Sequence, residues 1–377
     1  MKKIYYLGYY DDLRKEIRRN VHLGAVSKMN YIIGVLNSLD FKVEVISLAN
    51  PIIKGKFPAE TVVINKYTNL KLFKSTYKRN KLLRVINRFI NKIRYIIYLA
   101  FQLKTNDILI VYHSLDNLRL INLLVKFKKL NVIYEVEEIY SDYLLQGDYR
   151  NKEIKFLSQA NSYIFSNDYL PEIIAKDKPH VVLYGAYNIH KISTNNRFND
   201  GKIHCVYAGG LSETKGGADI VVDSAIYLDK NYHIHLIGIG SKEEEHRIKE
   251  RIINVNKISK CEVTYGEPLT GKDFDDFLSK FDIGLAIQHS FALMNVTSFP
   301  SKLISYLSNG LKVISSNILS VKNSKVSKDI YFVNCDDPYE VAKTIREVSS
   351  YNSNTDKIIA NLDQTFKKDF KNILNKM

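Results

Sequence analysis

The chain has 377 residues, of which 45% are hydrophobic and 25% charged, and a formal net charge of +15. This length exceeds one ordinary hydrophobic core, so we expect two domains, and the composition is that of a globular protein. Three widely spaced cysteines argue against a disulfide framework and show no metal-binding spacing.

Strands and helices alternate along the first half of the chain. The predicted strands are residues 3–8, 42–48, 107–114, 131–138, 161–167 and 180–187, and the predicted helices are 25–39 and 115–130. This alternation indicates a mostly parallel sheet covered on both faces. The N-terminal lysines precede an apolar run that is too short for a signal peptide.

A basic stretch with helical spacing covers residues 77–103. Arg84, Arg88 and Lys92 recur every four residues, and large aliphatic side chains line another face. The window 61–106 contains 11 Lys or Arg and no acid. A basic amphipathic helix of this kind predicts contact with an anionic membrane, and the alternative is a domain helix with a solvated basic face. The longest apolar run here has nine residues, too few to span a bilayer.

Acidic residues end one strand of this basic half. Strand alternation places Glu135 and Glu137 on one side and Glu138 on the other. Glu137 or Glu138 could bind acceptor hydroxyls or act as a general base. His113, just past a strand end, is the third catalytic candidate, and its alternative is a capping or core histidine.

A polar segment, residues 190–202, interrupts the alternation and is predicted to be a linker. Strands are then predicted at 203–210, 232–240, 261–267, 282–288, 312–316 and 329–334, with helices between them. We therefore expect an α/β protein with two doubly wound, Rossmann-like domains. The predicted parts are residues 1–189, the linker, residues 203–352, and a C-terminal helix, 353–377, that returns to the first domain.

Several predicted strands of the second half end in glycine-rich or polar loops. These are "YAGGLSETKGG" at 207–217, "HLIGIGSKEE" at 235–244 and "VTYGEPLTGKDF" at 263–274. The carboxyl edge of an open α/β sheet is where ligands bind, and Lys215 would place a cation beside a helix start there. Each loop alone is also compatible with an ordinary βα turn.

The segment "TSFPSKLISYLSNGLKVISS", residues 297–316, predicts a loop, a helix, a glycine stop and a strand. Ser298 is the predicted N-cap, with Pro300 in the first turn and Gly310 ending the helix. The preceding loop carries no acid and the first turn carries Lys302, so this helix start suits an anion such as phosphate. The alternative is an ordinary α/β crossover.

In this order, these motifs resemble the C-terminal, sugar-nucleotide-binding half of GT-B glycosyltransferases. The likeness is greatest to the family 4 type of bacterial capsule, O-antigen and exopolysaccharide synthesis. It implies two Rossmann-like domains that face a cleft, with the donor against the second domain. It also implies no essential metal and no cofactor besides the donor nucleotide sugar.

Residues of this chain match the family motifs as follows. Lys215 matches the lysine that contacts the donor diphosphate, and Glu267 with Pro268 matches the loop that touches the base. Ser298 and Phe299 match the helix start that faces the diphosphate. The full set of candidate donor-binding residues is Gly24, Gly209, Gly210, Lys215, Gly238, Gly240, Tyr265, Glu267, Pro268, Asn295, Thr297, Ser298, Phe299, Lys302 and Ser305.

The chain also departs from the family pattern. Gly210 stands where the family usually has an arginine, and Thr297 and Ser305 stand where family 4 enzymes have two glutamates. Neither hydroxyl side chain can carry the charge of a glutamate. Lys302 is the substitute that we expect to contact the phosphates or the ribose.

These features predict a metal-independent glycosyltransferase that moves a sugar from a nucleotide diphosphate donor, expected to be UDP-linked, to a lipid-linked or growing surface-glycan acceptor. We expect it in the cytoplasm, on the inner face of the cell membrane. A sugar-nucleotide epimerase of the same fold and a catalytically degenerate GT-B protein remain alternatives. A basic nucleic-acid-binding protein is the alternative from another class, although no nucleic-acid motif is present.

Overall fold

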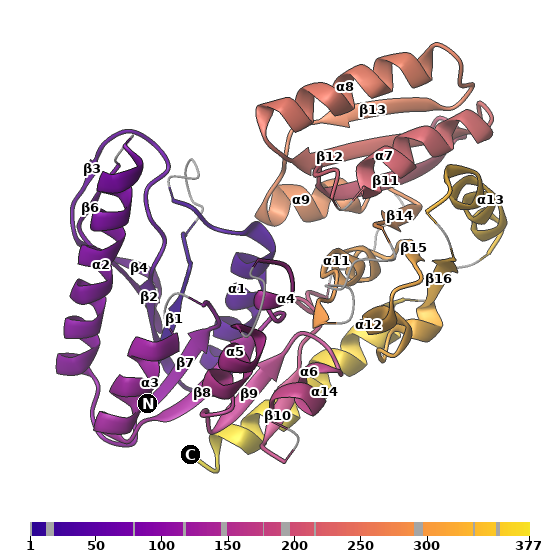
Figure 1. Ribbon diagram of the computed structural model, residues 1–377. Helices are drawn as coiled ribbons and strands as arrows, with labels where there is room; N and C mark the ends of the chain where they lie inside the picture. Colours follow the sequence, from indigo (N-terminus) through magenta and orange to yellow (C-terminus); the bar gives the residue numbers. More distant parts are fainter. Residues whose placement is uncertain are drawn as a thin grey trace. The chain divides into compact units, whose positions relative to one another are not determined.

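The protein is described here by a computed structural model covering residues 2–12, 19–77, 80–115, 118–144, 149–175, 177–189, 197–214, 216–289, 297–334, 336–351 and 355–377. The chain forms two units, and each contains one large sheet with helices on it (Figure 1). The first unit comprises Met1–Ala186 with Thr365–Met377, and the second comprises Tyr187–Gln364. Helix α14 (Asp356–Leu374) therefore starts in the second unit and ends in the first, as expected from the sequence.

The sheet of the first unit has eight strands in the order β10-β9-β8-β7-β1-β2-β5-β4. Their bounds are β1 Lys3–Gly8, β2 Lys42–Ser47, β4 Glu60–Asn65, β5 Thr68–Leu72, β7 Ile108–Tyr112, β8 Asn131–Val136, β9 Ser162–Phe165 and β10 His180–Val182. Every pairing is parallel except that of β4 with β5, a hairpin that our sequence reading missed. A short antiparallel pair, β3 (Lys56–Phe57) with β6 (Ser75–Thr76), lies outside this sheet.

The helices of the first unit are α1 Leu23–Ser38, α2 Lys81–Gln102, α3 Leu118–Lys128, α4 Ser141–Leu144, α5 Tyr149–Leu157 and α6 Leu170–Ile174. The central strands are buried along almost their whole length, because helices cover both faces of a parallel sheet. This confirms the near-continuous apolar runs as strands of a doubly wound sheet.

The sheet of the second unit has six parallel strands in the order β13-β12-β11-β14-β15-β16. The strands are β11 Ile203–Gly210, β12 Tyr232–Ile239, β13 Glu262–Gly266, β14 Ile283–Ala286, β15 Lys312–Ser316 and β16 Ile330–Val333. The helices are α7 Gly217–Ser224, α8 Lys242–Asn256, α9 Gly271–Leu278, α11 Lys302–Ser308, α12 Leu319–Lys322 and α13 Pro338–Ser349, with short 3₁₀ turns η2 (Ala225–Tyr227) and η3 (Ser327–Asp329). The chain adds strands outward from β11 to β13 and then returns to the other side of β11, so the strand order reverses between β11 and β14.

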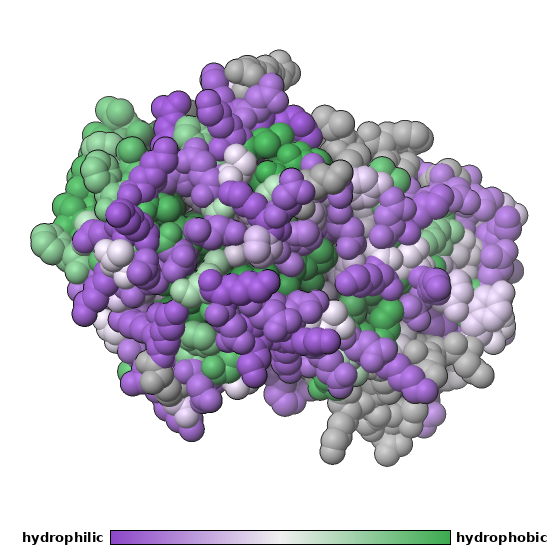
Figure 2. All heavy atoms as spheres, turned by 90° about the horizontal axis from the view of Figure 1, so that it is seen from below, coloured by the Kyte–Doolittle hydropathy of each residue, from purple (hydrophilic) through white to green (hydrophobic). Residues whose placement is uncertain are grey.

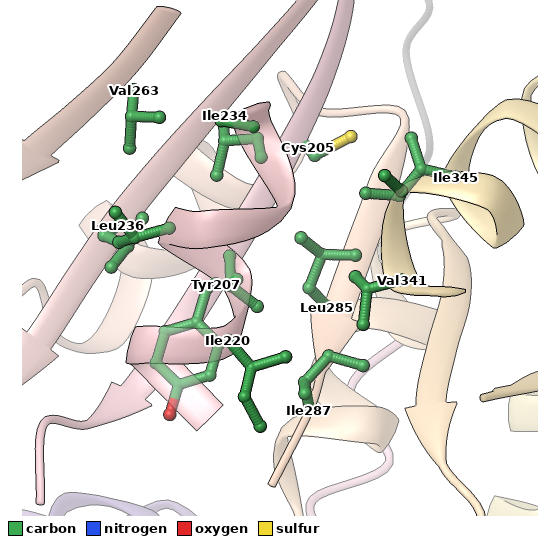
Figure 3. Packing of buried hydrophobic residues seen from close by; sticks show 14 of the residues in the cluster. Cys205, Tyr207, Ile220, Ile234, Leu236, Val263, Leu285, Ile287, Val341 and Ile345 are labelled. Atoms are coloured by element: carbon green, nitrogen blue, oxygen red, sulfur yellow. The ribbon is translucent and has the colours of Figure 1, made fainter. Parts of the chain in front are cut away.

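One face of this second sheet packs against α7, α8 and α13. Figure 3 shows this core, with Tyr207 of β11 beside Ile220 of α7 and Leu285 of β14 beside Val341 of α13. Cys205 and Cys261 belong to the same core and are free thiols. Burial raises the pKa of Cys261 to about 12, which keeps this thiol protonated and unreactive. Cys335 lies outside the described residues.

Helix α11 corrects one prediction. It begins at Lys302 with Ser301 as the preceding residue, so Ser298 is not its N-cap. The first turn is set instead by backbone carbonyls, because Leu303 N–H donates to Pro300 O at 3.0 Å and Ile304 N–H donates to Ser301 O at 3.1 Å. The predicted glycine stop is confirmed, since Gly310 has a left-handed φ of 76° directly after the helix.

Candidate functional site

The reversal of strand order makes the carboxyl ends of β11 and β14 the expected ligand edge of the second unit. Two predicted donor residues meet there although they are far apart in sequence. A Cβ atom on Gly209 would lie 2.9 Å from Lys302 Nζ. The same ammonium lies 3.9 Å from the centroid of the Tyr207 ring, a cation–π distance. The tertiary structure thus holds one cation next to a strand end that lacks a side chain.

Tyr207 and Tyr306 fix the surroundings of this lysine. The hydroxyl of Tyr207 donates to Gly210 O at 2.9 Å, which orients the aromatic face under the ammonium. The hydroxyl of Tyr306, on α11, accepts a hydrogen bond from Ala208 N–H at 2.8 Å. The Tyr306 ring also fills the space that a Cβ on Gly284 would occupy, at 2.4 Å. Helix α11 is therefore tied to both β11 and β14.

The glycines at the start of α7 are required by close packing. Gly216 has a left-handed φ of 61°, and a Cβ there would lie 2.0 Å from His289 Nε2. A Cβ on Gly217 would lie 1.9 Å from the carbonyl oxygen of Ile287. The helix start therefore lies directly against the end of β14. Lys215, the residue before it, lies outside the described residues.

His289 and Asp336 belong to the same edge, and our sequence reading did not select them. His289 Nδ1 lies 2.9 Å from Asp336 Oδ2, and its other nitrogen faces the Gly216 backbone. The carboxylate of Asp336 therefore orients the His289 ring at this edge. The one signal in the sequence was their place after a strand, since His289 lies three residues past the end of β14 and Asp336 three residues past the end of β16.

Gly238 and Gly240 have a packing role in this structure. A Cβ on Gly238 would lie 2.5 Å from Leu211 Cδ2 and 2.7 Å from Gly209 O, so the loop after β11 rests on Gly238. Gly240 precedes a capping box in which Ser241 and Glu244 bond each other's backbone. Three glutamates fill the first turn of α8, and their charge disfavours an anion there.

The remaining donor candidates of the second unit fall into two groups. Glu267 and Pro268 are exposed after β13, and Tyr265 next to them donates to Gly238 O at 3.3 Å. Thr297 and Phe299 are buried ahead of α11, whereas Ser298 and Ser305 are half-buried. Asn295 lies outside the described residues. Gly24 belongs to the first unit, where it is the second residue of α1.

In the first unit, His113 is fully buried. Its Nε2 lies 3.1 Å from Glu153 Oε1, and its ring centroid is 4.9 Å from that of Tyr140. Burial by itself raises the pKa of Glu153, but the adjacent His113 ring and the hydrogen bonds from Ser141 outweigh it, and the pKa is lowered. These contacts fit a histidine of the hydrophobic core, which was the alternative interpretation of the sequence, better than a histidine that touches the substrate.

The acids at the end of β8 form a second group, around the buried Glu135. Glu135 and Glu137 lie on one side, as strand alternation predicted, because each interacts with the other and with Lys28. Lys28 Nζ lies 2.7 and 2.9 Å from the two carboxylate oxygens of Glu137, and Tyr6 donates to Glu135 Oε2 at 2.5 Å. Burial and the charge of Glu137 raise the pKa of Glu135 to about 8. Glu138 is half-buried.

Comparison with known proteins shows which fold this architecture represents. No protein family and no curated protein sequence matches the chain. Solved structures match it over almost its whole length. The trehalose-6-phosphate synthase OtsA covers 100% of this chain and 99% of its own, with a TM-score of 0.70 at 10% identity. The chain has the GT-B fold.

Two further GT-B structures have the same likeness. Anabaena HepE in complex with UDP and glucose covers 100% of both chains, with a TM-score of 0.67 at 11% identity. Sucrose-phosphate synthase from Thermosynechococcus elongatus covers 99% of this chain and 95% of its own, with a TM-score of 0.67 at 12% identity. The fold is thus that of sugar-nucleotide glycosyltransferases.

Within the described residues, no helix is both long and apolar enough to cross a membrane.

Proposed function

We propose that this chain is a glycosyltransferase that uses a nucleotide diphosphate sugar, UDP-linked, as its donor. The observation that carries the proposal is the meeting of Lys302 with Gly209 at the switch point of the second sheet. A GT-B structure bound to UDP and glucose supports the choice of donor. The family 4 likeness of the motifs supports a role in the synthesis of surface polysaccharides.

The residues at this edge would act on the leaving group. When the bond from sugar to diphosphate breaks, negative charge develops on the diphosphate. Lys302 holds a positive charge against the Tyr207 face, and the bare backbone at Gly209 and Gly210 lets a phosphate approach closely. In our proposal Lys215 adds a second cation, and the two lysines replace a metal ion.

The acceptor would come from a membrane surface. Helix α2 is held to the first unit by Tyr95, Leu99 and Leu103, which are buried, whereas its N-terminal part is exposed on most sides. The large apolar side chains that α2 exposes are Leu82, Leu83, Val85, Ile86, Phe89, Ile90, Ile93, Ile97 and Phe101. The aliphatic face predicted from the sequence is therefore not covered by the rest of the unit.

Basic residues accompany this apolar surface. Arg84 and Arg88 are exposed on the same helix, and Leu123 and Phe127 of the adjacent α3 are exposed as well. Figure 2 shows hydrophobic residues gathered at the left edge, on the side where α2 lies in Figure 1. An apolar helix face next to arginines is typical of helices that lie in the interface of an anionic membrane. We propose that α2 docks there and brings the enzyme to a lipid-linked acceptor.

Calorimetric titration with UDP tests the donor site. Lys302→Ala should weaken UDP binding by about 1.5–3 kcal/mol, because it removes a hydrogen bond to a charged group. Lys257→Ala, at an exposed lysine after α8, is the matched control and should leave the affinity unchanged. Equal UDP affinity in wild type and Lys302→Ala would contradict the proposed site.

Turnover then tests the reaction. Purified protein with membrane extract as acceptor should release UDP from one member of a panel of UDP-sugars and incorporate that sugar into lipid-extractable material. Conversion of the donor to an epimer without transfer would instead identify an epimerase. UDP binding with no turnover of any donor would identify a degenerate enzyme.

A further inference from the structure

Three histidines gather at the other end of the second sheet. His204 lies at the start of β11, and His233 and His235 lie at the start of β12. The strand register pairs His204 with His233, and alternation places His235 on the same face. One ring nitrogen from each histidine lies within 4.8 Å of those from the other two. The cluster is on the sheet face opposite α7, α8 and α13, and at the edge opposite Gly209.

Two of the rings share a hydrogen bond, and each has an oxygen partner at its other nitrogen. His204 Nδ1 lies 2.9 Å from His235 Nε2. The second nitrogen of His204 lies 2.9 Å from Asp200 Oδ1, and the second nitrogen of His235 lies 3.1 Å from Thr264 Oγ1. Histidines that bind a metal are typically held in this way, with the outer nitrogen donating to a carboxylate or another oxygen.

The third ring has oxygen partners as well. His233 Nε2 lies 3.2 Å from Thr264 Oγ1, and its Nδ1 lies 3.8 Å from Glu262 Oε2. Glu262 is about half exposed, so its carboxylate can move toward the rings. Three imidazoles with one nearby carboxylate match the number and type of ligands that a tetrahedral zinc site uses.

Aromatic packing holds the rings in place. Phe198 stacks on His204 with centroids 4.0 Å apart, and Phe281 meets His235 edge-on at 4.9 Å. His233 and His235 stack on each other at 3.9 Å. Side chains whose rotamers are already restricted by packing lose little conformational freedom when they bind a ligand.

We propose that His204, His233 and His235 bind one divalent transition metal ion, with zinc preferred and with Glu262 or water in the fourth position. Nitrogen and oxygen ligands of this kind suit zinc, cobalt and nickel. The ion would join β11 to β12 and, through Asp200, hold the segment before β11 against the sheet. Its role is structural and is independent of the proposed transfer reaction, because the donor candidates of the second unit lie at the opposite edge of the sheet.

Zinc titration of the full chain tests this proposal. After dialysis against a chelator, the protein is titrated with Zn²⁺ in competition with a chromophoric chelator. We expect one Zn²⁺ per chain and a rise in melting temperature on zinc addition. Addition of Co²⁺ instead should give the visible absorption bands of a tetrahedral site. Failure to bind Zn²⁺ under these conditions would overturn the proposal.

Variants locate the ion. His235→Ala should abolish stoichiometric binding, whereas His246→Ala, at an exposed histidine on α8, should retain it. Because His235→Ala could disturb folding, Asp200→Asn provides a milder change at a half-exposed residue. It should weaken zinc binding about 10- to 100-fold while the circular dichroism of the metal-free protein stays unchanged. Zinc binding of wild-type strength in both site variants would also overturn the proposal.

Discussion

The carboxyl edges of the two sheets carry different side chains. In the first unit, the polar and charged residues near the ends of β1 and β8 are Tyr6, Lys28, Glu135 and Glu137. In the second unit, the carboxyl edge carries glycines and Lys302. Both edges lie at the carboxyl ends of parallel strands. The acids suit hydrogen bonds to hydroxyl groups, and the glycines with a lysine suit phosphates. Two doubly wound sheets in one chain therefore offer different chemistry because the side chains at their carboxyl edges differ.

Among changes that should affect the function of one unit and not the other, we expect the largest effect from mutations in α2. Changing Arg84, Arg88 and Lys92 together to Glu should weaken binding to anionic vesicles at least 100-fold, because each basic group near such a surface contributes about 1 kcal/mol. Sedimentation with phosphatidylserine-containing vesicles at low salt measures this. Apart from Gly24 on α1, the donor candidates lie in the second unit, so UDP affinity should stay unchanged.

A matched charge change provides the control for that experiment. Lys257, Lys260 and Lys343 are exposed in the second unit, and their triple change to Glu alters the net charge equally. This variant should still sediment. Phe89→Ser tests the apolar face separately, since Phe89 is 63% exposed. Wild-type protein that stays in the supernatant would refute membrane docking.

The acid cluster of the first unit should make stability depend on pH. Because the pKa of Glu135 is raised from 4.5 to about 8, the folded chain binds a proton there that the unfolded chain has lost. The free energy of unfolding should therefore fall as pH rises from about 4.5 to about 8, by up to about 1.4 kcal/mol per pH unit from this group.

Urea unfolding across this pH range measures the effect. Glu135→Gln keeps an acceptor for the Tyr6 hydroxyl and removes the titration, so its stability should change less with pH than that of the wild type. Glu347→Gln, at an exposed residue of α13, should behave like the wild type. Identical pH profiles for Glu135→Gln and wild type would show that Glu135 is ionised throughout.

A smaller effect is expected from changing the glycines at the carboxyl edge of the second unit's sheet. The atom that a Cβ on Gly209 would meet is the end of the flexible Lys302 side chain, so Gly209→Ala should fold normally but displace the ammonium from Tyr207. We expect UDP affinity to fall by about tenfold or less, which corresponds to about 1.4 kcal/mol. Gly238→Ala is the contrast, because its Cβ would meet backbone at Gly209 O and should lower the melting temperature. Unchanged UDP affinity in Gly209→Ala would mean that the position of Lys302 is unimportant.

The smallest expected effect is that of metal removal on turnover. If lysines stabilise the leaving diphosphate, EDTA should leave the initial rate of UDP release unchanged at temperatures well below the melting point of the metal-free protein. The same treatment should lower the melting temperature if the histidine cluster holds zinc. Loss of turnover with EDTA and recovery with Mg²⁺ or Mn²⁺ would contradict the lysine-based site.

Much of the fold could be predicted from the sequence, because it depends on local patterns. Buried parallel strands need continuous apolar runs, and each run such as 107–114 or 203–210 became a strand. Gly310 was recognisable as a helix stop because few other residues tolerate its backbone angle. The hairpin of β4 and β5 was missed because β4 is mostly exposed and β5 alternates buried and less buried residues, so neither has a continuous buried run.

Only the tertiary structure decided which residues share a site. Spacing in the sequence could nominate Gly209 and Lys302 separately, but their contact depends on the order in which the strands assemble. His289 and Asp336 escaped notice for the same reason, and so did His204 with the two histidines of β12. The burial of His113 also depends on the side chains packed around it. The propensity to form a helix or strand depends on neighbouring residues. A site instead depends on contacts between residues far apart in the chain, and sequence patterns do not reveal these contacts.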